Sequence, residues 1–232
     1  MTTMLKRSKD RKVANSLTPS GAVRIANSFG LPAGIEYSCP NATSVCSKIC
    51  YAGKLEKIYK GCKDNLLHNW NALKDATYWD AFDMLSVMIL DFKKECVKAN
   101  AEKLFRIHWD GDFFNAAYID AWHDVILYND DVQFWAYTRV PSAAIALCEL
   151  PNLSLYFSTD EDNIETALEL NAKYGVKFAL LGKTFADAKN LAPVRTAVCP
   201  EQRKQIALNG ACVACGICTE GKTNIAFSIS KK

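Results

Sequence analysis

Ten cysteines in a chain of 232 residues constrain the structure most, because seven of them fall in two short windows. The seven are Cys39, Cys46 and Cys50, spaced C-x6-C-x3-C, and Cys199, Cys212, Cys215 and Cys218, spaced C-x12-C-x2-C-x2-C. Thiolates this close in sequence repel one another unless a metal ion or an iron–sulfur core neutralises their charge. The two windows therefore predict two metal-binding segments.

The C-terminal window favours iron over zinc. Its C-x2-C-x2-C run resembles the ferredoxin pattern, in which three close thiolates hold a cuboidal [4Fe–4S] cluster and a remote Cys-Pro supplies the fourth. Cys199-Pro200 is placed to be that remote ligand. Zinc usually takes C-x2-C pairs from two knuckles, so a zinc site is the alternative.

The N-terminal window supplies three thiolates, which would leave one iron of a cluster open to a small molecule. Cys62 is a minor candidate for the fourth ligand. A single cluster shared by both windows, with spare thiols, is the alternative to two clusters. Cys96 and Cys148 lie on apolar faces of expected helices, and we expect both to be core residues.

The composition argues against several classes of partner. No apolar stretch of about 18 residues is present, which argues against a membrane partner. No signal-peptide pattern follows the basic N-terminus, so we expect a cytoplasmic protein whose cysteines are reduced rather than paired in disulfides. The net charge of +3 is too small to indicate nucleic-acid binding.

A repeated strand–helix pattern occupies the second half of the chain and predicts an α/β fold with a parallel sheet. Strands are expected at 104–108, 132–139, 153–160 and 176–183, each followed by a helix, with a last short strand at 222–227 and earlier helices at 63–75 and 78–98. Too few units are present for a closed eight-stranded barrel, so we expect a partial, open TIM-type βα barrel with cysteine-rich cluster-binding segments at both ends.

We expect the chain to form a single domain over residues 1–232. Its parts are a loose basic tail at 1–16, an N-terminal cluster loop at 39–62, βα repeats at 104–190 and a C-terminal cluster segment at 199–227.

Polar residues follow the expected strands, at the edge where α/β proteins place their active sites. His108, Asp110 and Asp112 come after the first strand and are the candidate catalytic residues, although a turn or a helix cap would also explain the two carboxylates. Tyr137, Thr138 and Arg139 end the next strand and are the candidate cofactor-binding residues. The planar fork of Arg139 suits a substrate or cofactor carboxylate.

Several of these segments together resemble the phage "gene product 88" family. They are residues 39–52, 105–113, 134–139 and the C-terminal cysteines with Lys222-Thr223, in the same order over roughly residues 20–230. The resemblance implies a phage or prophage origin, and hence the cytoplasm of the host cell.

More remotely, the chain resembles radical S-adenosylmethionine enzymes that carry an auxiliary cluster, although its C-x6-C-x3-C spacing differs from their C-x3-C-x2-C. That resemblance implies S-adenosylmethionine as a candidate cofactor.

The leading hypothesis is an iron–sulfur protein with two [4Fe–4S] clusters, acting as a redox or radical-type enzyme on a small molecule. One alternative is a non-catalytic electron-transfer or redox-sensing module, which would have a redox partner in place of a substrate. Another is a zinc-stabilised binding protein. The sequence leaves open whether the protein is an enzyme.

Overall fold

A computed structural model describes residues 4–13, 17, 20 and 24–230. Within these residues the strands form one parallel sheet in the order β1-β2-β3-β4-β6-β5. The strands are β1 (Leu104–Ile107), β2 (Gln133–Thr138), β3 (Leu153–Thr159), β4 (Lys177–Gly182), β5 (Thr196–Val198) and β6 (Asn224–Ser228). The predicted α/β fold with a parallel sheet is confirmed.

The four predicted strand–helix units are present, and each of the first three strands pairs with the next along the chain. The helices that follow them are α5 (Ala116–Leu127), α6 (Pro141–Leu147), α7 (Ile164–Tyr174) and α8 (Phe185–Asn190). The last strand, β6, then inserts between β4 and β5. Strand β5 was not predicted, because its three residues contain no run of apolar side chains that marks them as a strand.

Two longer helices precede the sheet, close to their expected bounds. They are α3 (Lys60–Leu73) and α4 (Tyr78–Ala99). A capping box fixes the start of α4: the Thr77 hydroxyl accepts the Asp80 amide, and the Asp80 carboxylate accepts the Thr77 amide. The N-terminal cysteine segment, expected as a loop turning into a helix, contains α1 (Ser44–Ile49) and α2 (Tyr51–Ile58).

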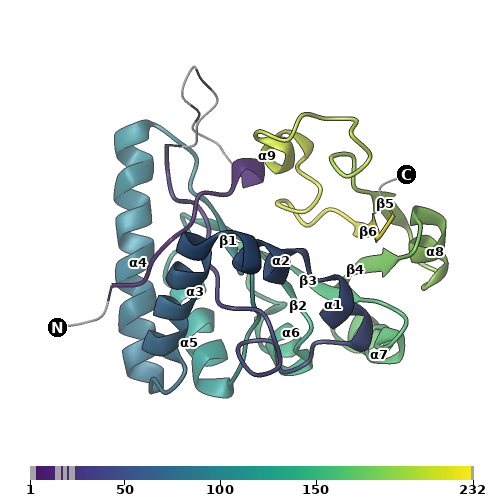
Figure 1. Cartoon of the computed structure of the whole chain (residues 1–232), viewed down its shortest axis with the longest axis horizontal. Helices are drawn as coiled ribbons and strands as arrows, with labels where there is room; N and C mark the ends of the chain where they lie inside the picture. Colours follow the sequence, from purple (N-terminus) through teal and green to yellow (C-terminus); the bar gives the residue numbers. More distant parts are fainter. Residues whose placement is uncertain (1–3, 14–16, 18–19, 21–23, 231–232) are drawn as a thin grey trace.

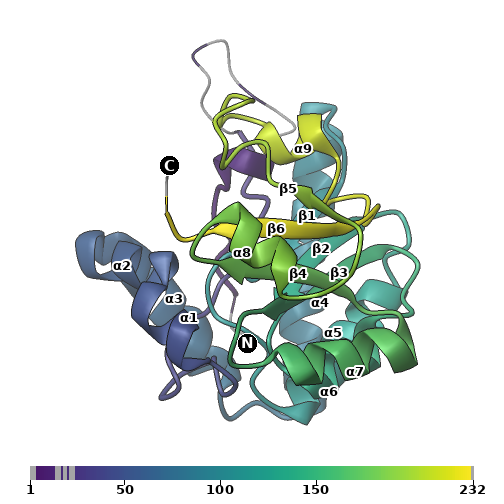
Figure 2. The same ribbon diagram turned by 90° about the vertical axis from the view of Figure 1, so that its right-hand side faces the viewer.

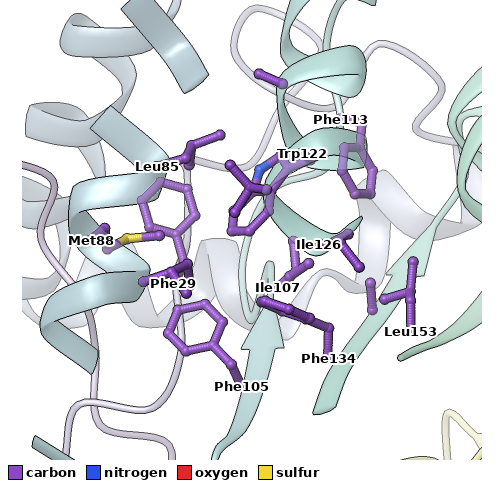
Figure 3. Packing of buried hydrophobic residues seen from close by; sticks show 14 of the residues in the cluster. Phe29, Leu85, Met88, Phe105, Ile107, Phe113, Trp122, Ile126, Phe134 and Leu153 are labelled. Atoms are coloured by element: carbon purple, nitrogen blue, oxygen red, sulfur yellow. The ribbon is translucent and has the colours of Figure 1, made fainter. Parts of the chain in front are cut away.

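The main apolar core lies between the sheet and α4–α6. Figure 3 shows strand residues Phe105 and Phe134 packed toward Trp122 of α5 and Leu85 of α4. The Phe92 and Phe105 rings meet edge to face with centroids 4.9 Å apart. Burying side chains of this size contributes about 1.5–3 kcal/mol each, so this layer dominates the stability of the fold.

The C-terminal segment covers the opposite face of the sheet. Because side chains alternate along a strand, Trp135 and Tyr137 of β2 and Tyr156 of β3 point away from the helices. They pack with Cys218 and with partly buried Cys199, among others. The short helix α9 (Ala211–Cys215) lies in this layer and contacts the 3₁₀ turn η1 (Arg11–Val13), as Figure 1 shows.

The N-terminal tail was expected to be loose, and residues 1–3 and 14–16 of it lie outside the described residues. Residues 4–13 pack against the domain, with Leu5 and Val13 buried. Arg7 pairs with Glu95 of α4 at 2.7 Å, and Asp10 pairs with Arg106 of β1 at 2.6 Å. This part of the tail therefore has the contacts of a docked segment.

The sheet is open among the described residues, since β1 and β5 stand at opposite ends of the strand order. The free edge of β1 is covered by an extended segment in which the Phe29 amide donates to the Arg106 carbonyl at 3.1 Å. The curvature of a partial TIM-type barrel stays a prediction. No described helix combines the length and apolar character needed to cross a membrane.

Candidate functional site

Three of the C-terminal cysteines, Cys199, Cys212 and Cys218, pack against the face of the sheet opposite the helices, and Cys215 lies near Cys218. Burial raises the pKa of Cys218 to about 12, and the nearby Cys212, Cys199 and Cys215 raise it further. Burial likewise raises the pKa of Cys212 to about 12, and Cys199 adds to that effect. Because their pKa values are raised, the Cys212 and Cys218 thiols stay protonated until a metal ion replaces their protons.

Hydroxyl groups on the sheet hold this cysteine segment in place. The Tyr156 hydroxyl donates to the carbonyl oxygens of Ile217 at 3.0 Å and Thr223 at 3.1 Å. The Ser154 hydroxyl donates to the Thr219 carbonyl at 2.8 Å. These bonds from one strand therefore fix the loop that carries the last cysteine.

Tyr137 on the neighbouring strand β2 contacts Cys218 directly. Its hydroxyl donates a hydrogen bond to the Cys218 sulfur, which offsets part of the rise in the pKa of that thiol caused by burial. A donor of this kind stabilises negative charge on the sulfur.

Two cations also face the C-terminal cysteines. Arg106 and Lys12 both oppose the effect of burial on the pKa of Cys212. The Arg106 guanidinium lies 4.9 Å from the centre of the Trp135 ring and donates to the Tyr51 hydroxyl at 3.3 Å. Arg106 therefore binds Tyr51, the residue next to Cys50, and also lowers the pKa of Cys212.

The C-terminal cysteines supply four thiols, a donor set that both zinc sites and cuboidal iron–sulfur clusters use. No three His, Cys, Asp or Glu side chains of the described chain converge closely enough to hold one ion. Zinc, with Zn–S bonds near 2.3 Å, would need sulfurs about 3.8 Å apart. A cuboidal cluster places each thiolate on a different iron and so accepts wider spacing, and its usual donors are four cysteines.

Two of the N-terminal cysteines, Cys46 and Cys50, lie at the start of helices. The Cys50 sulfur accepts the Gly53 amide at 3.3 Å and so caps α2, where the helix dipole favours negative charge. Burial raises the pKa of Cys50, and Asp110 and Cys46 add to the effect. Cys46 donates its amide to the Thr43 hydroxyl at 3.0 Å, which caps α1.

Asp110 lies among three of the cysteines near this end of the chain. It raises the pKa of Cys39, Cys50 and Cys62, in each case in addition to the larger effect of burial. The pKa of Cys39 reaches about 12. Cys62 therefore lies near the same carboxylate as two predicted metal ligands.

Asp110 itself is only 3% exposed, and burial followed by the nearby Glu56 raises its pKa to about 8. Its Oδ1 accepts the Gly111 amide at 2.9 Å. When both carboxyl groups are ionised, Oδ2 has no hydrogen-bond partner among the described residues, whereas a proton on either group lets Asp110 and Glu56 form a hydrogen bond. The two carboxyl groups are therefore arranged to hold one proton between them.

Asp112 is buried and makes several internal hydrogen bonds. It accepts the Thr138 hydroxyl at 2.6 Å and the Arg139 amide at 2.7 Å, so it ties the loop after β1 to the end of β2. Burial raises its pKa to about 6, although these bonds favour the ionised form. A catalytic role for Asp112 stays a prediction.

His108 lies among aromatic rings on the helix-covered face. Its Nε2 is 2.8 Å from the Tyr118 hydroxyl, and its ring packs against Phe113 with centroids 4.6 Å apart. Burial lowers its pKa to about 3, so the imidazole is neutral at physiological pH. Its catalytic role also stays a prediction.

The three candidate cofactor-binding residues point to different partners. Tyr137 contacts Cys218, and Thr138 binds Asp112. Arg139 forms an ion pair with Asp160, in which Nη1 lies 2.8 Å from Oδ2. The geometry of this pair does not meet that of a hydrogen bond. Asp160 also accepts the Thr43 hydroxyl at 2.7 Å, which fastens the N-terminal cysteine segment to the end of β3.

Sequence reasoning missed four residues of this region, namely Glu56, Arg106, Lys12 and Tyr156. A charged residue inside the apolar strand 104–107 was a usable signal for Arg106, because a strand interior accepts charge only where that charge has a partner. Glu56 and Lys12 had no comparable signal, since exposed helices and tails commonly carry charges.

Comparisons with known proteins agree on one family. The family model described as "Gene product 88" matches residues 3–221. The "Gene 88 protein" of Mycobacterium phage L5 is 52% identical over 98% of this chain and 99% of its own length. The "Gene 88 protein" of Mycobacterium phage D29 is 51% identical, again over 98% of this chain and 99% of its own length. No solved structure matches the chain.

Proposed function

This chain belongs to the gene product 88 family, and from the placement of its cysteines we propose that it is a redox iron–sulfur protein with two [4Fe–4S] clusters. The observation that supports the proposal is the packing of Cys199, Cys212 and Cys218 on the face of the sheet opposite the helices, with Cys215 near Cys218 and with Arg106 and Lys12 near Cys212. Iron bound there would supply one-electron transfer, and the four thiolates would leave no iron open.

The N-terminal cysteines would hold the second cluster in an open form. Cys39, Cys46 and Cys50 would be its ligands, and the remaining coordination position would be available to a small molecule. Asp110 lies near Cys39 and Cys50, so this residue, together with Glu56, would hold a proton beside the bound molecule. S-adenosylmethionine is one candidate for that molecule.

Arg106 would connect the two centres. Its positive charge lowers the pKa of Cys212, and its guanidinium donates a hydrogen bond to the hydroxyl of Tyr51, the residue next to Cys50. Asp10 pairs with Arg106 and offsets part of its charge. The remaining positive charge between two thiolate clusters would still reduce their mutual repulsion.

A second candidate function is a non-catalytic electron-transfer or redox-sensing module. It is favoured by the internal contacts of the predicted catalytic residues, since Asp112 binds Thr138 and Arg139, while His108 binds Tyr118. A substrate would have to compete with those bonds.

Anaerobic purification followed by iron, sulfide and zinc analysis tests the proposal. We expect about eight irons and about eight sulfides per chain, because two cuboidal clusters contain four of each. Addition of S-adenosylmethionine should change the electron paramagnetic resonance spectrum of the reduced protein if the molecule binds the open iron. A colourless preparation with stoichiometric zinc and no sulfide would contradict the proposal.

A further inference from the structure

A surface groove lies beside the C-terminal cysteine segment, between helix α8 and the turn that follows strand β5. Its volume is about 660 Å³. It is lined by Phe185, Ala186, Lys189, Val198, Gln202, Arg203 and Lys204. Figure 2 shows α8 and β5 on the side of the molecule that faces the viewer.

The charge of this groove is positive and uncompensated. Lys189, Arg203 and Lys204 are exposed, and in the described part of the chain none of them forms an ion pair. The nearest acidic residues in sequence are already engaged: Asp187 caps α8 by accepting the Thr184 amide at 2.9 Å, and Glu201 pairs with Lys12 at 2.7 Å.

Hydrogen bonds join the groove to Cys199 and to the sheet. The Arg203 amide donates to the Cys199 carbonyl at 3.2 Å, so this cation lies one turn from a predicted iron ligand. Gln202 exchanges two hydrogen bonds with Ser228 of β6, at 2.6 and 2.9 Å, which holds the same turn against the sheet.

We propose that this groove docks a small acidic electron-carrier protein that reduces the C-terminal cluster, an inference that rests on the proposed function. One electron passes from the reduced centre of the carrier to the oxidised cluster, and no covalent bond forms or breaks. Electron-transfer complexes use small interfaces and charge complementarity, and the three cations here surround the apolar side chains of Phe185 and Val198.

A protein partner suits the groove better than a nucleic acid. Binding to a phosphate backbone needs a stripe of cations, whereas only three line this groove, and the chain as a whole carries a net charge of +3. Nucleic-acid binding is therefore an outcome that the test has to detect.

The test reverses the charge of the groove in a double variant, Arg203→Glu with Lys204→Glu. A reduced, acidic [2Fe–2S] ferredoxin is the probe, and stopped-flow absorbance follows reduction of the anaerobically purified protein. We expect the second-order rate constant to fall at least tenfold at low salt, because electrostatic steering raises association rates by about tenfold or more. Binding of the oxidised ferredoxin, followed by calorimetric titration, should weaken in parallel. Reduction by dithionite should stay unchanged.

Matched controls separate the groove from general charge effects. Lys94→Glu with Lys98→Glu makes the same change in net charge at a second basic groove on α4, and we expect its rate with ferredoxin to remain near that of the unmodified chain. Lys189→Glu, on a different element from Arg203, should reproduce part of the loss if the double variant acts through docking rather than through misfolding.

Four results would overturn the inference. Equal losses in the groove variant and in the α4 control would assign the effect to net charge. An unchanged rate in the groove variant, with normal iron content, would remove the docking site and leave the proposed function intact. Binding of single-stranded DNA is measured in parallel, and its loss in the groove variant without loss of ferredoxin binding would assign the groove to nucleic acid. A chain without iron would overturn the proposed function and this inference together.

Discussion

At the scale of single residues, Tyr137 joins the sheet to the cysteines through the hydrogen bond that it donates to Cys218. Tyr137→Phe removes that donor and keeps the ring. Because a hydrogen bond to sulfur favours the more negative, reduced cluster, we expect the reduction potential of the C-terminal cluster to fall. A redox titration followed by electron paramagnetic resonance measures the change.

Tyr174→Phe is the control for this variant, since that tyrosine ends α7 and its ring lies beside Lys173 rather than a cysteine. An unchanged potential in Tyr137→Phe would mean that the hydroxyl does not act on a cluster ligand.

His108 gives a second prediction at this scale, on pH dependence. Burial lowers its pKa to about 3, so below pH 6.5 the unfolded chain takes up a proton that the folded chain refuses. The stability from this residue is therefore complete above pH 6.5 and is lost as the pH falls from there toward 3. Between pH 7.5 and 5.5 the loss amounts to about 1.4 kcal/mol.

Urea unfolding at these two pH values measures the effect. His108→Asn keeps a residue that tolerates the positive φ of 57° at this position and removes the titrating group. The pH dependence of its unfolding free energy should be smaller by the same amount. Identical pH dependence in both proteins would show that His108 is not buried in its neutral form.

At the scale of elements, the ion pair between Arg139 and Asp160 fastens the N-terminal cysteine segment to the sheet, because Asp160 also binds Thr43 at the start of α1. Asp160→Asn leaves the arginine charge buried without its partner. We expect a loss of about 3–5 kcal/mol of unfolding free energy, the range for breaking a buried pair. Iron content should fall toward half, with the N-terminal cluster lost first.

Asp162→Asn is the control for Asp160→Asn, because Asp162 binds Ser44 of the same segment from a more exposed position. It should cost less stability and retain both clusters. Equal iron loss in the two variants would mean that the buried ion pair has no special part in holding the segment.

The elements also show what could be predicted from the sequence. Strands β1–β4 and helices α3–α8 follow from apolar periodicity, and the short strand expected at 222–227 is found as β6. The hydrogen bond from Tyr156 to Ile217, and the place of β6 between β4 and β5, could not be predicted, since both depend on contacts between distant segments. The same limit applies to the catalytic candidates. The position of His108 after a strand was correct, whereas its burial among aromatic rings depends on α5.

At the scale of the whole molecule, different interactions stabilise the two faces of the sheet. The helix-covered face is a large apolar core, whereas the opposite face packs the C-terminal cysteine segment on a smaller cluster. Removal of iron by a chelator should therefore loosen residues 199–221 and 39–62 and leave β1–β4 protected. Hydrogen exchange followed by mass spectrometry measures this difference.

Equal loss of protection in β1–β4 would contradict this division, because it would mean that the core depends on the metal.

The central claim is that the cysteines of this gene product 88 protein hold iron–sulfur clusters. X-ray absorption at the iron and zinc edges of the anaerobically purified chain tests it most directly. The account predicts an iron signal with a sulfur shell and a second, metal–metal shell, because each cuboidal cluster contains neighbouring irons. A zinc signal with sulfur at about 2.3 Å and no metal–metal shell would contradict it.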